Sequence, residues 1–98
     1  MEVDFVDPDL DRLETDPTFT AGQSQEVVRG YRKVIQQIRA ADDERDFYAQ
    51  RGLRFEKLKG KREHQRSMRI NNQWRLILEI NDGVNPHRIK IVAIEDYH

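Results

Sequence analysis

Residues 66–80 of the chain read RSMRINNQWRLILEI, and this stretch decides the fold that the sequence predicts. Met68 and Ile70 alternate with polar neighbours, which is typical of a strand with one buried face. The pair Asn71-Asn72 predicts a turn, because asparagine tolerates the backbone angles that turns require. The next run alternates again, and one of its faces carries Trp74, Leu76, Leu78 and Ile80, opposite Arg75, Ile77 and Glu79. The stretch therefore predicts two strands of one sheet, joined by a tight turn.

The sequence on either side of this stretch extends the same sheet. Downstream, Asn81-Asp82-Gly83 is a strong hairpin signal. The run at 89–94 is apolar on both faces, as expected of a strand near the middle of a covered sheet. Upstream, the pattern predicts a strand that begins at Leu53 and Phe55, followed by a turn at Gly60.

The beginning of the chain predicts a short strand and a short helix. Val3, Phe5 and Val6 make an apolar opening that is consistent with an edge strand. Asp7-Pro8 then predicts a helix start, with aspartate as the cap and proline at the first helical position. Pro17 stops this helix.

The clearest helix of the sequence follows Ser24, which is a suitable capping residue. Its apolar side chains recur every three or four positions, as on the buried face of a helix; they are Val27, Val28, Tyr31, Val34, Ile35, Ile38 and Ala41. A further short helix is expected from about 43 to 50, closed by Gly52.

Together these elements predict an α+β fold over a single domain, residues 1–98. Helices come first and a meander of strands follows, so the N-terminal helices should pack on one face of a small, mostly antiparallel, twisted sheet.

The distribution of charge indicates a binding surface for a polyanion. The net charge is only -1, but residues 51–75 hold nine basic and two acidic side chains, whereas residues 1–50 hold twelve acidic and six basic ones. Such asymmetry is typical of a basic patch on an acidic body. The alternative is an ordinary solvated surface.

The composition excludes several other classes of function. The chain has no cysteine, and its three histidines lack metal-ligand spacing, which argues against disulfides and zinc. Its five glycines form no phosphate-binding loop, and Ser24 and Ser67 lie in no hydrolase motif. Neither a membrane span nor a leader is evident, so we expect a soluble protein of the reducing cytosol.

What remains is a cationic sheet with polar groups at its C-terminal end. The candidate phosphate-binding residues are Arg54, Lys57, Lys59, Lys61, Arg62, Arg66, Arg69 and Arg75. Trp74 offers a stacking surface, or else is simply a core residue. Asp96-Tyr97-His98 brings together three side chains capable of proton transfer, with Tyr97 on the face opposite the other two; the alternative is a frayed chain end.

Three motifs in residues 55–98 resemble the HigB family of toxins from toxin–antitoxin systems, within the RelE/ParE superfamily. The first is Leu58-Lys59-Gly60-Lys61-Arg62, the second runs from Ser67 to Arg75, and the third is Glu95-Asp96-Tyr97-His98. The corresponding family pattern is approximately L-K-G-D-R, then S-I-R-I-N-D-Q-W-R-I, then D-Y-H at the C-terminus. The spacing of the motifs and the ending make the resemblance specific, and it implies a RelE-like fold.

The resemblance implies ribosome-dependent cleavage of mRNA, in which the 2′-hydroxyl of the RNA attacks the adjacent phosphate without a metal or cofactor. His98 would act as base or acid, and Arg75 and Lys59 would stabilise the phosphate. Asp96 would orient His98 or transfer a proton, and Tyr97 would position a base. The remaining cations and Trp74 would bind RNA; they are Arg54, Lys57, Lys61, Arg62, Arg66 and Arg69.

The implied partners are the ribosome, mRNA and a helix-turn-helix, HigA-like antitoxin through which the complex would bind its operator. Two other functions remain open. One is a ParE-like inhibitor of DNA gyrase on the same fold, although such proteins typically lack the ending Asp96-Tyr97-His98. The other is an interaction module without catalysis, for which the basic segment alone would account.

Overall fold

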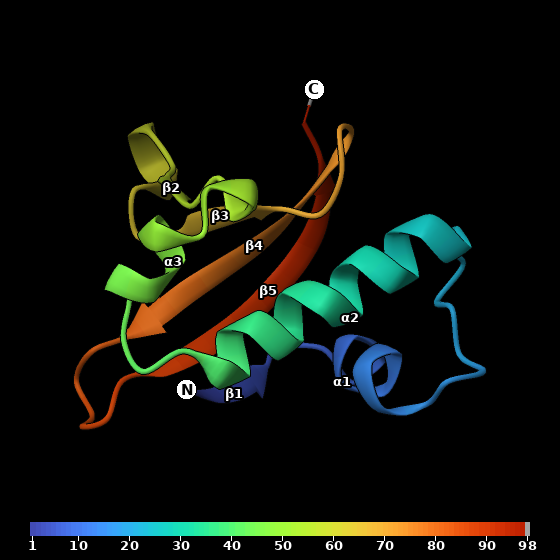
Figure 1. The fold of residues 1–98 in the computed structure, drawn as a ribbon, viewed down its shortest axis with the longest axis horizontal. Helices are drawn as coiled ribbons and strands as arrows, with labels where there is room; N and C mark the ends of the chain where they lie inside the picture. The colour runs from blue at the N-terminus through green and yellow to red at the C-terminus, as the bar shows by residue number, and fades with distance from the viewer. Residues whose placement is uncertain (98) are drawn as a thin grey trace.

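A computed structural model describes residues 1–97 (Figure 1). The helices are α1 (Pro8–Thr15), α2 (Gln25–Ala40) and α3 (Arg45–Ala49), with short 3-10 turns at Arg51–Leu53 and Gly60–Arg62. The strands are β1 (Glu2–Phe5), β2 (Glu56–Lys57), β3 (Arg66–Arg69), β4 (Trp74–Asn81) and β5 (Arg88–Asp96). Within these described residues, no helix combines the length and the apolarity needed to cross a bilayer.

The five strands form one sheet in the order β1-β5-β4-β3-β2. β1 pairs with β5 in parallel, and every other pair of neighbours is antiparallel. This confirms the expected α+β class with a mostly antiparallel sheet. It also explains the apolar character of the last strand, because β5 lies between β1 and β4 and is paired along both edges.

A bulge in β5 brings its apolar residues onto the core face. Ile77 pairs with Ala93 and Leu78 pairs with Ile91, so one extra residue, Val92, stands between two consecutive pairs. The extra residue reverses the alternation of the strand. In a regular strand the odd-numbered Ile89 and Ile91 would face away from the even-numbered Ile94. Because the bulge lies between them, all three side chains contact the core.

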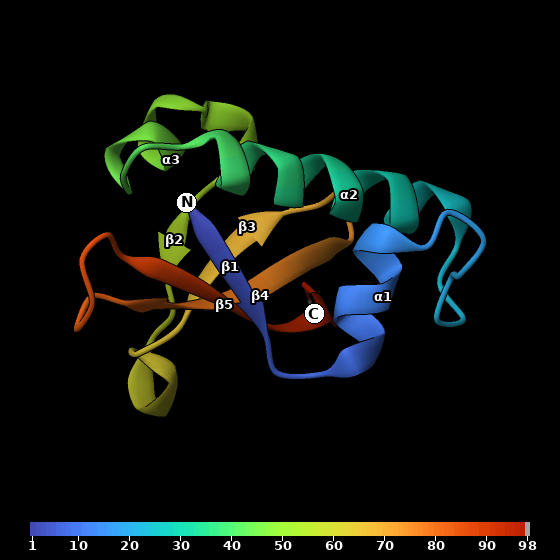
Figure 2. The same cartoon turned by 90° about the horizontal axis from the view of Figure 1, so that it is seen from below.

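α2 covers one face of the sheet, and α3 lies on the same side (Figure 2). The helix begins as expected, with Ser24 Oγ accepting a hydrogen bond from the amide of Val27 at 3.2 Å. Asp7 caps α1 through the amide of Asp9 at 2.8 Å. The core between helices and sheet includes from the helices Leu13, Val28, Tyr31, Val34, Ile35, Ile38 and Phe47, and from the strands Met68, Leu76, Leu78, Ile89 and Ile91.

The segment after α3 differs from the sequence prediction. α3 ends at Ala49 with Gln50 as its C-cap, close to the expected end at 50, but Leu53 belongs to a 3-10 turn rather than to a strand. Leu53 and Phe55 are both buried, and the ring of Phe55 packs 5.2 Å from that of Phe47. The apolar alternation at 53 and 55 therefore belongs to a tightly packed turn and not to a strand.

One close approach lies between α2 and the turn that follows β3. A Cβ added to Gly30 would lie 2.6 Å from Cγ2 of Ile70 and 3.1 Å from its carbonyl oxygen. Ile70 is β-branched and stiff, so neither atom moves away easily. Glycine is therefore retained in the middle of a helix, where alanine has a better intrinsic propensity.

We expect Gly30→Ala to destabilise the protein. Overpacking costs roughly 1–3 kcal/mol and the gain in helix propensity returns about 1 kcal/mol, so the net loss should be about 1 kcal/mol in urea unfolding. Gly52→Ala is the control, because a Cβ there meets nothing within 4 Å. A Gly30→Ala protein as stable as Gly52→Ala would show that the two layers are not held at this distance.

His87 and Glu44 link the loop between β4 and β5 to the start of α3. The atoms Nδ1 and Oε1 lie 2.6 Å apart. The hydrogen bond that His87 donates to the Glu44 carboxylate raises the pKa of His87 above 6.5. Partial burial alone would raise the pKa of Glu44, but the hydrogen bond and charge of His87 lower it below 4.5.

The stabilisation from this pair should therefore depend on pH in both directions. The part due to His87 is present below pH 6.5 and is lost as pH rises through the raised pKa; the part due to Glu44 is lost as pH falls through the lowered one. We expect His87→Gln to lower Tm most between pH 4.5 and 6.5, with a smaller effect at pH 9. A difference in Tm that is constant over this range would contradict the ion pair.

Candidate nucleic-acid interface

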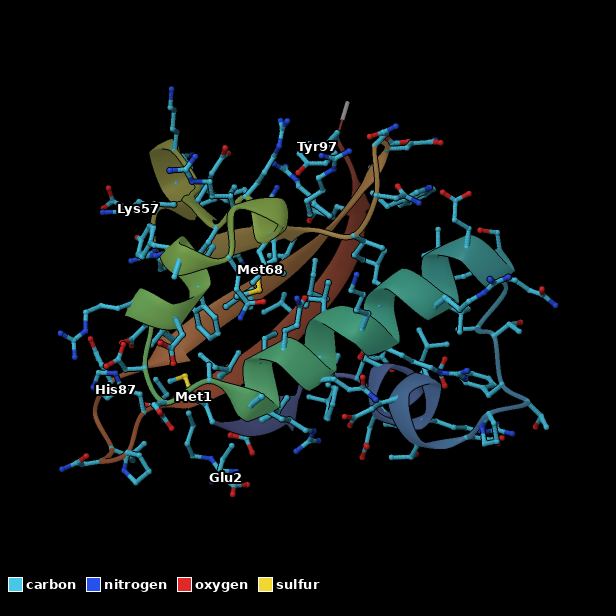
Figure 3. The ribbon with its side chains drawn as sticks, viewed as in Figure 1. Met1, Glu2, Lys57, Met68, His87 and Tyr97 are labelled. Atoms are coloured by element: carbon cyan, nitrogen blue, oxygen red, sulfur yellow. The ribbon has the colours of Figure 1, made fainter. Side chains whose placement is uncertain are left out.

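The sheet face away from α2 carries a row of long charged side chains. The strand register aligns Arg69 with Arg75, and Arg75 with Glu95. Side chains two residues apart share a face, so Tyr97 continues this row beyond the end of β5. Tyr97 follows the C-terminal end of β5, whereas His87 precedes the N-terminal end of the same strand (Figure 3). Beneath the row, Ile77 and Ser67 are 0% and 1% exposed.

Arg75 is a cation with unused hydrogen-bonding capacity. Its side chain is 20% exposed, and its nearest carboxylate oxygen, on Glu95, is 3.6 Å from Nη2. Its Nε is buried and has no hydrogen-bond acceptor within residues 1–97. The guanidinium carbon lies 5.6 Å from the centre of the Tyr97 ring, within range of a cation–π interaction. Arg75 and Tyr97 therefore form a unit with open donor capacity.

Arg62 reaches the same row from the 3-10 turn at Gly60–Arg62. Its two terminal nitrogens donate to the two oxygens of Glu95 at 3.0 and 2.7 Å, and its Nε donates to Gln65 at 3.0 Å. The hydrogen bond from Arg62 holds the pKa of Glu95 below 4.5, with Arg75 adding to the effect. Glu95 is thus an ionised carboxylate between two guanidinium groups.

Two further arginines surround Tyr97. A cavity of about 200 Å³ is lined by Arg54, Arg69, Asn72 and Tyr97. Arg54 occupies a left-handed backbone conformation with φ 46°. Arg69 donates to the backbone oxygen of Asn71 at 3.3 Å and to the side chain of Asn72. The cavity thus joins two guanidinium groups, which bind phosphate oxygens in pairs, to an aromatic ring.

Asp96 lies on the face of the sheet opposite to Glu95 and Tyr97. Asp96 pairs in register with Trp74 and accepts a hydrogen bond from Gln73 at 3.1 Å, on the side away from Tyr97, as the alternation predicts. Trp74 is half-buried, so its exposure lies between that of a core residue and that of an open stacking surface, the two alternatives that the sequence left open. His98 lies outside the described residues.

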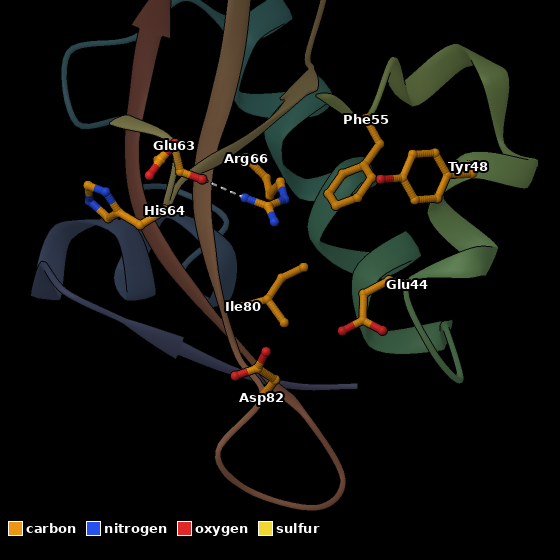
Figure 4. A pocket seen from close by; sticks show the side chains of 8 residues that line it. All are labelled: Glu44, Tyr48, Phe55, Glu63, His64, Arg66, Ile80 and Asp82. Carbon is orange, nitrogen blue, oxygen red and sulfur yellow. Dashed lines mark hydrogen bonds between the residues drawn. The ribbon is translucent and has the colours of Figure 1, made fainter. Parts of the chain in front are cut away.

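Not all of the basic residues lie on the open face. Arg66 faces α3 instead, in a cavity of about 420 Å³ (Figure 4). One nitrogen of Arg66 donates to the backbone oxygens of Glu63 and Gln65 at 3.0 and 3.3 Å. The cavity also contains an aromatic pair, Tyr48 and Phe55, with ring centres 5.0 Å apart. Arg66 is therefore separated from the arginines around Tyr97.

Three lysines lie near the outer edge of the sheet. Lys57 is in the edge strand β2, and Lys59 and Lys61 are in and beside the following 3-10 turn. All three are exposed. They extend the positive charge to the β2 edge of the sheet, and Arg62 lies in the same 3-10 turn as Lys61.

Glu95 is part of the site although the sequence pattern predicts no role for it beyond its place in the C-terminal motif. Beside this group, Gln65 donates to Glu79 at 3.2 Å, and His64 lies 3.8 Å from Glu79. A signal for Glu95 was available, because it stands two residues before Tyr97 and so shares its face. Its ionic partner Arg62 is 33 residues away, which no local pattern reveals.

The chain is similar to known toxins in sequence and in fold. A family model described as a RelE-like toxin of the type II toxin-antitoxin system HigB matches residues 4–91. Among solved structures, the chain is similar to a YoeB/ParE toxin from Agrobacterium tumefaciens, with 16% identity, 100% coverage of both chains and a TM-score of 0.60. That identity is low enough for the likeness to show the fold alone. No significant match was found among curated proteins.

Proposed function

Because the chain belongs to the HigB-like family of RelE-like toxins from type II toxin–antitoxin systems, we propose that it inhibits growth by cutting mRNA on the ribosome. It acts in the cytoplasm, where translating ribosomes are found. Its partner is a helix-turn-helix, HigA-like antitoxin that neutralises it and carries the complex to operator DNA.

The observation that carries this proposal is the open donor capacity of Arg75 beside Tyr97. The Arg75 side chain is 20% exposed and Nη2 lies 3.6 Å from the carboxylate of Glu95, so the terminal nitrogens can donate to an anion that arrives from solvent. The adjoining cavity adds two more arginines. RNA supplies phosphates for the guanidinium groups and bases that stack on the tyrosine ring.

In the proposed reaction the 2′-oxygen forms a bond to the adjacent phosphorus while the bond to the 5′-oxygen breaks. The products are a 2′,3′-cyclic phosphate and a 5′-hydroxyl. His98 takes the proton of the 2′-hydroxyl or delivers one to the departing 5′-oxygen. Asp96 orients His98 or carries the other of these two proton transfers. Arg75 and Lys59 stabilise the charge on the phosphorane, and Tyr97 positions a base. The reaction as written consumes no cofactor.

The first test is expression of the protein without antitoxin, followed by mapping of mRNA 5′ ends. The wild type should create new ends inside translated frames and arrest growth. Arg75→Ala should reduce their number by about 100-fold or more, since it removes a group that stabilises transition-state charge, and His98→Ala should do the same. Arg45→Ala is the matched control, because that side chain is 91% exposed on α3.

Other outcomes would redirect the proposal. Growth arrest with intact mRNA and DNA damage would favour inhibition of gyrase. Full toxicity of both Arg75→Ala and His98→Ala at equal protein levels would refute the assignment of these residues.

A second test separates the two groups of arginines by RNA binding. The probe is a fluorescent single-stranded 2′-O-methyl oligoribonucleotide, which lacks the attacking hydroxyl and cannot be cut. Arg69→Gln should weaken binding about fivefold and reduce the salt dependence by about 0.7 in log–log slope, the value for one phosphate contact. Arg66→Gln, which removes the same charge from the α3 side, should change the affinity less than about twofold. Equal effects of both variants would mean that total charge, not this face, binds RNA.

A further inference from the structure

Glu95 is a negative charge at the centre of the surface proposed to bind phosphate. Its carboxylate receives two hydrogen bonds from Arg62 at 3.0 and 2.7 Å and lies 3.6 Å from Arg75. The strand register holds it directly opposite Arg75. A carboxylate whose only effect was to repel RNA phosphates would weaken RNA binding at this place, so Glu95 is expected to have a more specific role.

The contact between Arg62 and Glu95 has the geometry that an arginine uses for a phosphate. Two nitrogens of the planar guanidinium meet two oxygens of one anion, and carboxylate and phosphate fit this fork equally well. The side chains of Arg62 and Glu95 are 41% and 33% exposed, so an incoming anion can reach the pair from solvent.

We propose that Glu95 occupies the phosphate-binding fork of Arg62 and neighbours that of Arg75 in the free protein, and that an RNA phosphate must displace it. The carboxylate thereby limits the affinity for polyanions away from the ribosome, where the protein would otherwise bind RNA indiscriminately. The identity of the ligand as RNA rests on the proposed function, whereas the competition for the fork is a property of these three residues.

Two simpler roles for Glu95 agree less well with its surroundings. Arg62 lowers the pKa of Glu95, which makes this carboxylate a poor acceptor for the proton of a hydroxyl group. An ion pair between side chains this exposed also contributes little to stability, so it is not needed to hold the fold. Gln65 independently bonds Arg62 at 3.0 Å and keeps it in place.

Glu79 provides a matched control for the loss of one negative charge. It is half-buried on β4, like Glu95 on β5, and its carboxylate contacts Gln65 and His64 instead of an arginine. Glu79→Gln and Glu95→Gln therefore change the net charge equally. Only Glu95→Gln removes a carboxylate from the paired terminal nitrogens of Arg62.

The experiment measures binding of the uncleavable 2′-O-methyl oligoribonucleotide at ~0.1 M salt, after circular dichroism has shown that each variant is folded. Glu95→Gln should bind about fivefold more tightly than the wild type, and Glu79→Gln less than about twofold more tightly. The gain from Glu95→Gln should shrink toward that of Glu79→Gln when Arg62→Gln is added to the wild type and to Glu95→Gln alike, because the fork that Glu95 occupies is then gone and only Arg75 remains beside it.

Equal tightening by the two single variants, weaker binding by Glu95→Gln, or an undiminished gain in the Arg62→Gln background would each overturn the proposal. Elution from a heparin column repeats the comparison with a sulfated polyanion and decides the matter if the oligonucleotide does not bind. There Glu95→Gln should elute at higher salt than both the wild type and Glu79→Gln. Neither assay requires cleavage, so failure of the nuclease proposal in the 5′-end mapping would leave this result intact, and the reverse also holds.

Discussion

The burial of α2 against β4 and β5 is the interaction on which the rest of the structure depends. Tyr31, Ile35 and Ile38 are fully buried on the helix side, and they meet fully buried strand residues such as Leu76 and Leu78. Each such side chain contributes roughly 1.5–3 kcal/mol on leaving water, before the loss of conformational entropy is subtracted. Gly30 permits the close approach of the two layers, because no Cβ separates α2 from Ile70.

Packing on one side of the sheet leaves the other side free for charged residues. Alternation along the strands sends Arg75, Glu95 and Tyr97 away from α2 because Leu76 and Ile94 point toward it. Ile77 on this face is fully buried, and long charged side chains can cover such apolar surface with their aliphatic stems while their charged ends stay accessible. One constraint thus produces both the core and the candidate interface.

The electrostatic character of the open face follows from arginines that come from separate parts of the chain. Arg54 and Arg62 arrive on turns, whereas Arg69 and Arg75 are fixed by strand pairing. Positive charges gathered on one face repel one another unless counter-charges are near. Glu95 supplies such a charge between Arg62 and Arg75, and the same position makes it a competitor for any phosphate that binds there.

The sequence by itself determined the helix starts, the order of the strands along the chain and the α+β class, because caps, periodicity and turn residues act over a few neighbouring positions. It was wrong at Leu53 and Phe55, where a packed turn imitates the alternation of a strand. It also grouped Arg66 with the other cations and passed over Glu95. Only the tertiary structure decided those two points. Arg66 faces α3 and Glu95 pairs with Arg62 because residues distant in sequence meet when the sheet and helices pack together.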